Sequence, residues 1–232
     1  MHDNGAMAKS NLFDSRVQRV LDRLHGEARA DKWKFAWRMP MLAWAALRKR
    51  TGDPAFEHAF FHDVYIPVSR EQGAMLYLLA RGTGARRVVE FGSSFGISTI
   101  YLAAAVRDNG GGEVIGSELE PAKHARATEN IEEAGLSAYA RVLPGDAQAT
   151  FRNIEAPIDL LLLDGWKGLY LPILQLLAPK LRPGAFVLAD NIFTFRKSLR
   201  PFVEYVQSGR NGFVSTTLHV SDGFELSVRV QG

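Results

Sequence analysis

The chain has 232 residues, of which 47% are hydrophobic and 23% charged, with a formal net charge of only +3. This composition is that of a folded globular chain and excludes disordered, collagen-like and coiled-coil proteins. The absence of cysteine excludes disulfides, thiolate metal sites and a cysteine nucleophile. No secretory leader and no apolar run of about 20 residues is found, so we expect a cytoplasmic protein without a membrane span.

The basic character is local, since the first 50 residues carry a balance of +6. The first 85 residues are mostly helical in pattern, with turn signals at Met39-Pro40 and at 51–54. Three of the four tryptophans, interleaved with basic side chains, lie in this part: Trp33, Trp37 and Trp44. Such a segment fits a helix packed on the core or on a dimer partner, a lid over a pocket, or a surface for membrane or nucleic acid.

From Val88 onward, short β-rich runs alternate with helical stretches. The apolar runs at 158–163 and 185–189 are continuous, which is typical of strands buried on both faces. We expect further strands at 88–91, within 112–118 and at 140–143, helices at 97–107, 122–134, 169–181 and 198–207, and a break at Pro183-Gly184. Two alternating runs, 213–220 and 224–230, predict an antiparallel hairpin. The fold class is therefore α/β, with a doubly wound, mostly parallel seven-stranded sheet, a C-terminal antiparallel hairpin and additional N-terminal helices.

The loop after the first strand, Gly92-Ser93-Ser94-Phe95-Gly96, lies where ligands bind in open α/β sheets. Ser94 occupies the second glycine position of a dinucleotide fingerprint, where a side chain would crowd the pyrophosphate. The loop also fits a nucleophile elbow, with Asp190 and His219 following in the order that serine hydrolases use, but no earlier strands supply the rest of that fold. A tight turn without a ligand is the plainest interpretation. Glu118, at the end of the second strand, favours instead a bound nucleoside, as in S-adenosylmethionine. Its carboxylate can accept hydrogen bonds from both ribose hydroxyls.

Asp164 and the pair Asp190-Asn191 end two buried apolar runs. A carboxylate at such a place is costly unless it is paired or bound to a cation. Two carboxylates and an amide supply three hard oxygens, which suit Mg²⁺ or another hard divalent cation. Alternatively, one aspartate caps a helix and the other pairs with an arginine.

These motifs together resemble the class I S-adenosylmethionine-dependent, metal-dependent O-methyltransferases of the catechol and caffeoyl-CoA type, over residues 66–230. The similar segments, in order, are Glu90 to Ser98, Ser117-Glu118-Leu119-Glu120-Pro121, Leu163 to Tyr170 and Ala189-Asp190-Asn191. The resemblance implies a Rossmann-like fold and a single domain over 1–232. Within it, 66–232 forms the S-adenosylmethionine-binding catalytic fold and 1–65 a helical extension or lid.

The resemblance also implies roles for individual residues. The cofactor's methionine half would lie among Val68, Glu90, Gly92, Ser93 and Ser98, its ribose on Glu118, and its adenine near Asp146 and Ala147, with Asp164 also adjoining the cofactor. Mg²⁺ would be held by Asp164, Asp190 and Asn191. Lys167 would be the general base for the substrate hydroxyl.

The chemistry of that mechanism has independent physical support. A phenolic hydroxyl has a pKa near 10, coordination to Mg²⁺ favours its ionised form, and a lysine beside a cation can accept the proton. Without the resemblance, Lys167 is interpreted as a solvated surface lysine three residues after Asp164. We expect a small aromatic vicinal diol as acceptor and a homodimer, with a nucleoside hydroxyl in tRNA as the alternative acceptor and a serine hydrolase using Ser94 as the remote alternative.

The sequence departs from the pattern of this family at two places that concern the methyl acceptor. The segment 192–197 is short and basic where the plant enzymes carry a longer substrate loop. Glu204 falls in a predicted helix rather than in that loop, so no substrate role is carried over to it.

Overall fold

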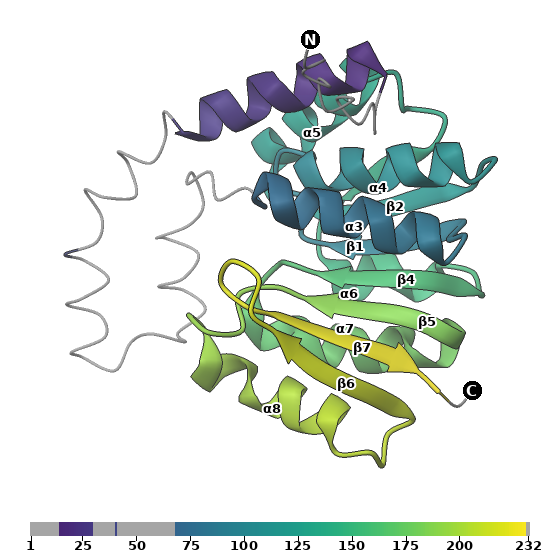
Figure 1. Cartoon of the computed structure of the whole chain (residues 1–232), viewed down its shortest axis with the longest axis vertical. Coiled ribbons are helices and arrows are strands. Elements are labelled where there is room, and N and C mark those ends of the chain that lie inside the picture. Colours follow the sequence, from purple (N-terminus) through teal and green to yellow (C-terminus); the bar gives the residue numbers. More distant parts are fainter. Residues whose placement is uncertain (1–13, 30–39, 41–67, 231–232) are drawn as a thin grey trace, which may run out of the picture.

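The computed structural model of the chain describes residues 14–29, 40 and 68–230. One seven-stranded sheet with the strand order β3-β2-β1-β4-β5-β7-β6 organises this part of the chain (Figure 1). Its strands are β1 Arg87–Phe91, β2 Glu113–Glu118, β3 Ala140–Pro144, β4 Ile158–Leu163, β5 Leu181–Ala189, β6 Phe213–Leu218 and β7 Phe224–Arg229. The first five strands pair in parallel, whereas β7 is antiparallel to both β5 and β6. The predicted fold class is confirmed.

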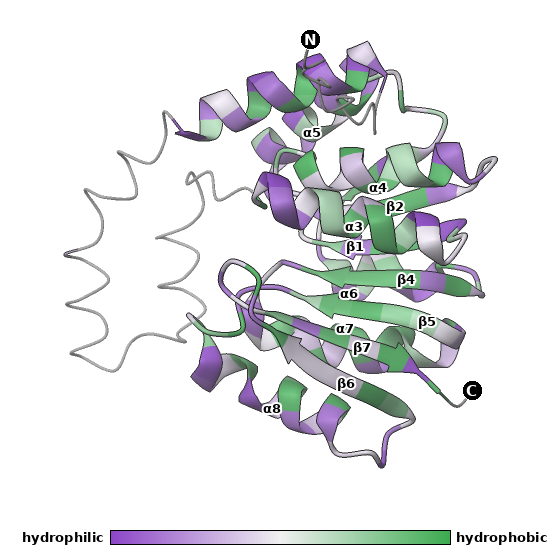
Figure 2. Ribbon diagram, in the orientation of Figure 1, coloured by the Kyte–Doolittle hydropathy of each residue, from purple (hydrophilic) through white to green (hydrophobic). Residues whose placement is uncertain are grey.

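Helices cover both faces of the sheet, and each face has its own apolar core. On one face lie α3 Arg70–Gly82, α4 Ile97–Asp108 and α5 Pro121–Glu133, over a core that includes Leu76, Ile100, Leu160 and Leu162. On the other lie α6 Ala147–Thr150, α7 Tyr170–Leu177 and α8 Arg196–Gln207, with Phe151, Leu161, Leu174 and Phe202. β1 and β4 bury side chains on both faces, and β4 is mostly hydrophobic in Figure 2.

The region after β4 differs from the prediction. The helix expected at 169–181 is a 3₁₀ turn, η2 Lys167–Leu169, then α7, then a second turn, η3 Ala178–Lys180. Pro179 favours the end of α7 at Leu177, since its nitrogen cannot donate to a preceding carbonyl. The predicted break at Pro183-Gly184 lies inside β5 instead, where the β4–β5 register shifts. Two further short elements were not predicted: α6 and the 3₁₀ turn η1 Phe151–Asn153.

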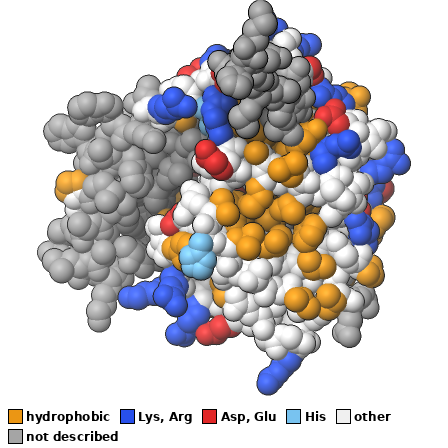
Figure 3. Space-filling model, viewed as in Figure 1, with side chains coloured by type: hydrophobic (Ala, Val, Ile, Leu, Met, Phe, Trp, Pro, Cys, Tyr) orange, Lys and Arg blue, Asp and Glu red, His pale blue; other side chains and the backbone are white. Residues whose placement is uncertain are grey.

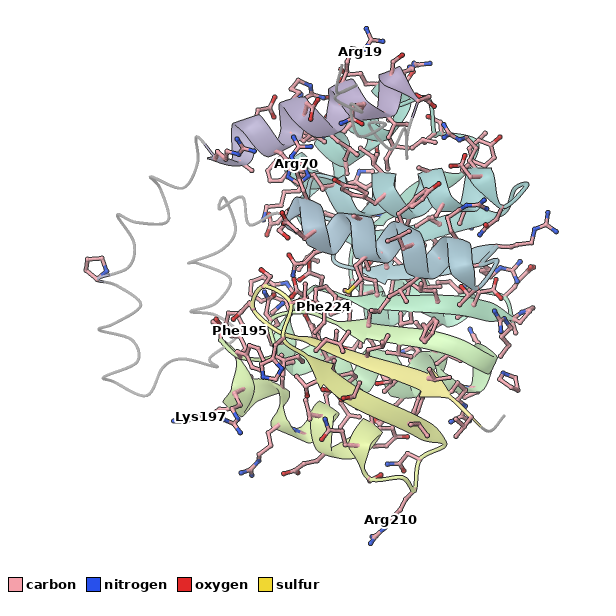
Figure 4. The ribbon with its side chains drawn as sticks, in the orientation of Figure 1. Arg19, Arg70, Phe195, Lys197, Arg210 and Phe224 are labelled. Carbon is pink, nitrogen blue, oxygen red and sulfur yellow. The ribbon has the colours of Figure 1, made fainter. Side chains whose placement is uncertain are left out.

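A helix over residues 15–29 packs on the α4–α5 side of the domain. Arg16 caps the end of α5, with Nε donating to the carbonyl of Glu133 at 2.6 Å and Nη2 to that of Glu132 at 3.1 Å. Arg70, at the start of α3, lies below the same helix in Figure 4 and donates to Asp22 Oδ1 at 2.7 Å. This helix therefore joins α3 and α5, which are far apart in sequence.

The remaining expectations for the first 65 residues, namely Trp33, Trp37, Trp44, the Met39-Pro40 kink and the turn at 51–54, lie outside the described residues. Over β5, β7 and β6 the α3 face of the sheet carries no described helix, and apolar side chains gather in the middle of that face in Figure 3. Within the described ranges, no helix is both long enough and apolar enough to cross a bilayer.

Candidate active site

The glycine loop follows β1 at the carboxyl edge of the sheet, as predicted. Gly92 and Gly96 have φ of +92° and +85°, values that favour glycine. A Cβ on Gly92 would lie 2.6 Å from Gly165 Cα, so the loop after β1 is in direct backbone contact with the loop after β4. The amide of Asp164 also donates to the carbonyl of Phe91 at 2.9 Å. The predicted cofactor loop and the predicted metal ligand are therefore adjacent.

Glu90, on β1, is fully buried without a cationic partner in the described structure. Its Oε2 accepts hydrogen bonds from Ser93 Oγ at 2.7 Å and from Thr99 Oγ1. Its Oε1 is also buried and accepts no hydrogen bond from the described residues. Burial raises the pKa of this carboxyl, and the hydroxyls of Ser98, Thr99 and Ser93 oppose the rise. Such an open anionic acceptor is suited to a cationic donor from a ligand.

Space around Glu90 depends on Gly116, on the neighbouring strand β2. A Cβ at this position would lie 2.1 Å from Ser93 Oγ and 3.3 Å from Glu90 Oε2. In the pairing of β1 with β2, Glu90 lies opposite Gly116. Because Gly116 has no side chain, there is room for the Ser93 hydroxyl that donates a hydrogen bond to Glu90. The sequence analysis did not single out this glycine.

Glu118 ends β2 beside the same loop. Its Oε2 accepts from the amide of Ser94 at 2.8 Å, and its Oε1 from the amide of Glu120 at 2.9 Å. The carboxylate is thus fixed by backbone donors, with further lone pairs for other partners.

The other predicted cofactor residues lie on the elements around this loop. Asp146 caps α6 by accepting from the amide of Gln148 at 2.9 Å and is exposed, whereas Ala147 is buried. Val68 is buried just before α3, and Ser98 is buried in the first turn of α4.

Two carboxylates lie at the ends of β4 and β5, of which Asp164 is half-buried and Asp190 is buried. Burial raises the pKa of Asp164 to about 6, against the lowering effect of Lys167. Burial and then repulsion from Asp164 raise the pKa of Asp190 to about 7. Two negative charges here are therefore costly, and one lysine offsets only one of them.

Lys167 lies in this cluster, with its side chain only 10% exposed, rather than at the surface. Its Nζ donates to Asn191 Oδ1 at 2.7 Å and to Tyr170 Oη at 2.7 Å, and it is 3.4 Å from Asp164 Oδ1. The Nζ also lies 5.6 Å from the centre of the Phe195 ring. The structure thus brings Lys167 together with two of the three predicted metal ligands.

Asn191 adopts φ of +66°, in the left-handed region that asparagine tolerates better than most residues. Its backbone amide donates to Asp190 Oδ1 at 2.6 Å. The loop that follows is held by the β6–β7 turn, since the Phe193 amide donates to the carbonyl of Asp222 at 3.0 Å. The local strain orients two adjacent oxygen-bearing side chains at one strand end.

The donor set fits a hard divalent cation. Asp164, Asp190 and Asn191 offer only oxygen, and the two carboxylates are under-compensated by Lys167. Among the described residues, no group of three or more His, Cys, Asp or Glu side chains is placed to hold a metal ion. The candidate set contains two such acids and is completed by an amide.

Sequence reasoning missed three contacts at this site. Thr99 donates to Glu90, Tyr170 accepts from Lys167, and Gln72 donates to Asp190 Oδ1 at 3.0 Å. Thr99 and Tyr170 lie one and three residues from residues that were singled out, so spacing could have found them. Nothing in the sequence points from Gln72 to a residue 118 positions away.

The described contacts give the serine hydrolase hypothesis no support. Asp190 is engaged by Gln72 and the Asn191 amide, and the His219 ring packs 5.0 Å from that of Phe193. The strands that precede a nucleophile elbow in hydrolases do not occur in the described sheet, whose first strand in sequence is β1.

Comparison with known proteins agrees with the geometry. The family model described as a methyltransferase domain matches residues 89–192, which include the glycine loop and both acidic strand ends. This part of the chain is similar to that methyltransferase domain, and it includes every proposed cofactor, metal and general-base residue except Val68.

Curated relatives of the methyltransferase domain are O-methyltransferases. A catechol O-methyltransferase of Niastella koreensis is 33% identical over 138 residues, which are 58% of this chain and 62% of that protein. A catechol O-methyltransferase of Mycobacterium tuberculosis is 36% identical over 129 residues, 55% of this chain and 57% of that protein. The chain thus spans about three fifths of the length of these relatives.

Solved structures match over more of the chain. An O-methyltransferase from Bacillus cereus, in complex with SAH, has 27% identity and a TM-score of 0.65 over 70% of this chain and 82% of its own. An O-methyltransferase from Streptomyces achromogenes involved in tomaymycin synthesis, in complex with SAM, has 28% identity and a TM-score of 0.65 over 75% of this chain and 86% of its own. These structures share the fold of this chain.

Proposed function

We propose that the protein is an S-adenosylmethionine-dependent O-methyltransferase that methylates a hydroxyl of a small aromatic vicinal diol held on Mg²⁺. The observation that carries this proposal is the contact of Gly92 with Gly165, which joins a cofactor-type glycine loop to a cluster of two carboxylates, an amide and a lysine. A methyl donor on one loop and a hydroxyl on the other would then be neighbours. The names of the curated relatives support a catechol-type acceptor.

The cofactor would lie along the carboxyl ends of β1 and β2. Glu90 Oε1, buried and open, would accept from the ammonium group of the methionine half. Glu118, already fixed by two backbone amides, would accept from the ribose hydroxyls. The remaining cofactor contacts are assigned to Val68, Gly92, Ser93, Ser98, Asp146, Ala147 and Asp164.

Lys167 would receive the proton of the substrate hydroxyl at Nζ. The oxygen then attacks the methyl carbon, the carbon–sulfur bond breaks, and S-adenosylhomocysteine leaves with the electron pair on sulfur. Tyr170 and Asn191 would orient the lysine through the 2.7 Å hydrogen bonds that they make to Nζ. Holding oxygen, carbon and sulfur in line contributes roughly 7–11 kcal/mol to lowering such barriers.

Asp164, Asp190 and Asn191 are assigned as the metal ligands. Bound there, Mg²⁺ would supply positive charge that favours the ionised form of the substrate hydroxyl. The buried, under-compensated charge of the two aspartates supports a divalent ion at this place.

Methyl transfer from labelled S-adenosylmethionine to a panel of catechols, with and without EDTA, tests the proposal. We expect transfer to at least one catechol, its loss with EDTA and its return with excess Mg²⁺. Unmodified tRNA forms a second arm of the experiment. Transfer to tRNA and to no catechol would replace the diol by a nucleoside hydroxyl, and transfer that EDTA leaves unchanged would remove the metal.

Three expectations accompany this proposal as predictions. They are a homodimer, a cytoplasmic location, and the division of one domain into a helical extension over 1–65 and a catalytic fold over 66–232. Light scattering coupled to size-exclusion chromatography tests the first, with a mass near 51 kDa expected from a 25.7 kDa chain.

A further inference from the structure

Gln72, on the first turn of α3, is only 3% exposed, and the proposed reaction does not use it. Its side-chain amide is engaged at both ends. Oε1 accepts from the backbone amide of Ser69 at 2.7 Å, and Nε2 donates to Asp190 Oδ1 at 3.0 Å. Gln72 therefore links the start of α3 to the end of β5.

The first of these contacts is half of a capping box. The Ser69 hydroxyl accepts from the backbone amide of Gln72 at 3.1 Å, and the Gln72 side chain accepts from the backbone amide of Ser69. Glutamate serves equally well in a capping box, because that role needs only an acceptor. The second contact needs a donor, which glutamine has and an ionised glutamate lacks. The helix start alone would accept glutamate at residue 72, whereas the hydrogen bond to Asp190 requires the amide donor of glutamine.

Asp190 is held asymmetrically. Its Oδ1 accepts from Gln72 Nε2 and from the Asn191 amide at 2.6 Å, whereas Oδ2 accepts no hydrogen bond from the part of the chain that the structure describes. Two donors on one oxygen fix the rotation of the carboxylate and leave the other oxygen for a ligand.

We infer that Gln72 is a positioning residue that presents Asp190 Oδ2 to the divalent cation. This inference rests on the proposed function, and it adds a residue from outside the strand ends that carry the ligands. Partners that orient metal-binding carboxylates in this way are worth 10- to 100-fold in metal affinity or activity.

The place of Gln72 is itself set by packing around α3. A Cβ on Gly73 would lie 2.3 Å from the Tyr101 ring, so the absence of a side chain lets α3 approach α4. His25 Nε2, on the helix over 15–29, lies 3.3 Å from Tyr101 Oη, and Arg70 donates to Asp22 on the same helix. The start of α3 is thus fixed on two sides before it reaches Asp190.

The test compares Gln72→Met with Ser69→Ala in the full chain. Gln72→Met keeps the size of the side chain but removes the donor to Asp190, whereas Ser69→Ala weakens the helix cap and keeps that donor. Mn²⁺ alone is the probe, and its binding is followed by the loss of the free-ion EPR signal. S-adenosylhomocysteine binding by calorimetry reports whether each variant is folded.

We expect Gln72→Met to bind Mn²⁺ 10- to 100-fold more weakly than wild type, with S-adenosylhomocysteine affinity within twofold. Ser69→Ala should lower the melting temperature yet keep Mn²⁺ affinity within twofold. Gln72→Leu, which also lacks the donor to Asp190, serves if Gln72→Met does not fold, and we expect the same weakening of Mn²⁺ binding.

Mn²⁺ affinity within twofold of wild type in both Gln72 variants would overturn the inference alone. Equal weakening by Ser69→Ala and Gln72→Met would do the same, because the effect would then follow the helix cap. A wild-type protein that binds S-adenosylhomocysteine but no Mn²⁺ would overturn the metal-dependent function, and the inference with it.

Discussion

The candidate site has two halves: a cofactor half around Glu90 and Glu118, and an acceptor half around Asp164, Lys167 and Asp190. The two halves hold their carboxylates in different ways. Glu90, in the cofactor half, is held by neutral hydroxyls from residues only three and nine positions away. Asp190, in the acceptor half, is held by a residue 118 positions away and lies in the field of Asp164 and Lys167. The hydrogen bonds of Glu90 therefore come from one loop and its helix, whereas the surroundings of Asp190 exist only when distant segments meet.

The difference has an energetic meaning. Glu90 has one open buried oxygen and no cation in the described structure, so a cationic ligand group complements it. Asp164 and Asp190 already share a lysine, so what they lack is further positive charge. The two halves are thus complementary to two different partners, an organic cation and a hard metal ion. Each prediction below perturbs one half and asks whether the other responds.

The largest effect is expected from Lys167→Met. The variant loses the proposed proton acceptor, so kcat for methyl transfer should fall about 10²- to 10⁴-fold. S-adenosylhomocysteine affinity, measured by calorimetry, should stay within twofold because the cofactor half is untouched. Lys197→Met is the matched control, since Lys197 is exposed and points away from the fold in Figure 4. A Lys167→Met enzyme with more than a tenth of the wild-type kcat would contradict the assigned role.

Asp190→Asn should weaken Mn²⁺ binding by at least about 100-fold, because it removes the negative charge of a ligand rather than the partner of a ligand. EPR titration measures the affinity, and S-adenosylhomocysteine binding should again be unchanged. Glu204→Gln is the control, because Glu204 is an exposed acid on α8 that pairs with Arg200 and not with a proposed ligand. The assignment of Asp190 fails if both variants bind Mn²⁺ as well as wild type does.

Glu90→Gln should weaken S-adenosylhomocysteine binding by about 10- to 100-fold, the value of a hydrogen bond to a charged group. Mn²⁺ affinity should stay within twofold. Glu225→Gln provides the comparison, because Glu225 is also fully buried and also held by neutral donors, such as Gln207 Nε2 at 2.8 Å. Equal losses in the two variants would indicate a general cost of altering buried acids instead of a cofactor contact.

The smallest effect concerns stability and pH. Asp164 and Asp190 have pKa values raised from 3.8 to about 6 and about 7, so between about pH 4 and pH 7 these two groups bind more protons in the metal-free folded protein than in the unfolded chain. Their contribution to the free energy of unfolding should therefore fall as pH rises through this window. Asp190→Asn removes one of these groups and should reduce the fall by about 1–3 kcal/mol, since one pKa unit corresponds to about 1.4 kcal/mol. Urea unfolding in EDTA at pH 5 and pH 8 measures the difference, and identical slopes in the two proteins would contradict it.

The sequence by itself determined the parts of this protein that depend on neighbouring residues. Continuous apolar runs predicted the buried strands β4 and β5, and alternation predicted the hairpin of β6 and β7. Glycine spacing placed the loop after β1, and strand ends placed Asp164, Asp190 and Asn191 at one edge of a parallel sheet. These features can be predicted from the sequence because side-chain periodicity and turn preferences depend on residues only a few positions apart.

Only the tertiary structure decided how the acceptor half is assembled. The capping box of α3 is readable as S-x-x-Q, but its second use, to hold Asp190, depends on packing that brings α3 beside β5. The close approach of Gly92 to Gly165 and of Gly116 to Ser93 likewise follows from strand order. Contacts between distant segments depend on how whole elements pack, and no local pattern of residues encodes that arrangement.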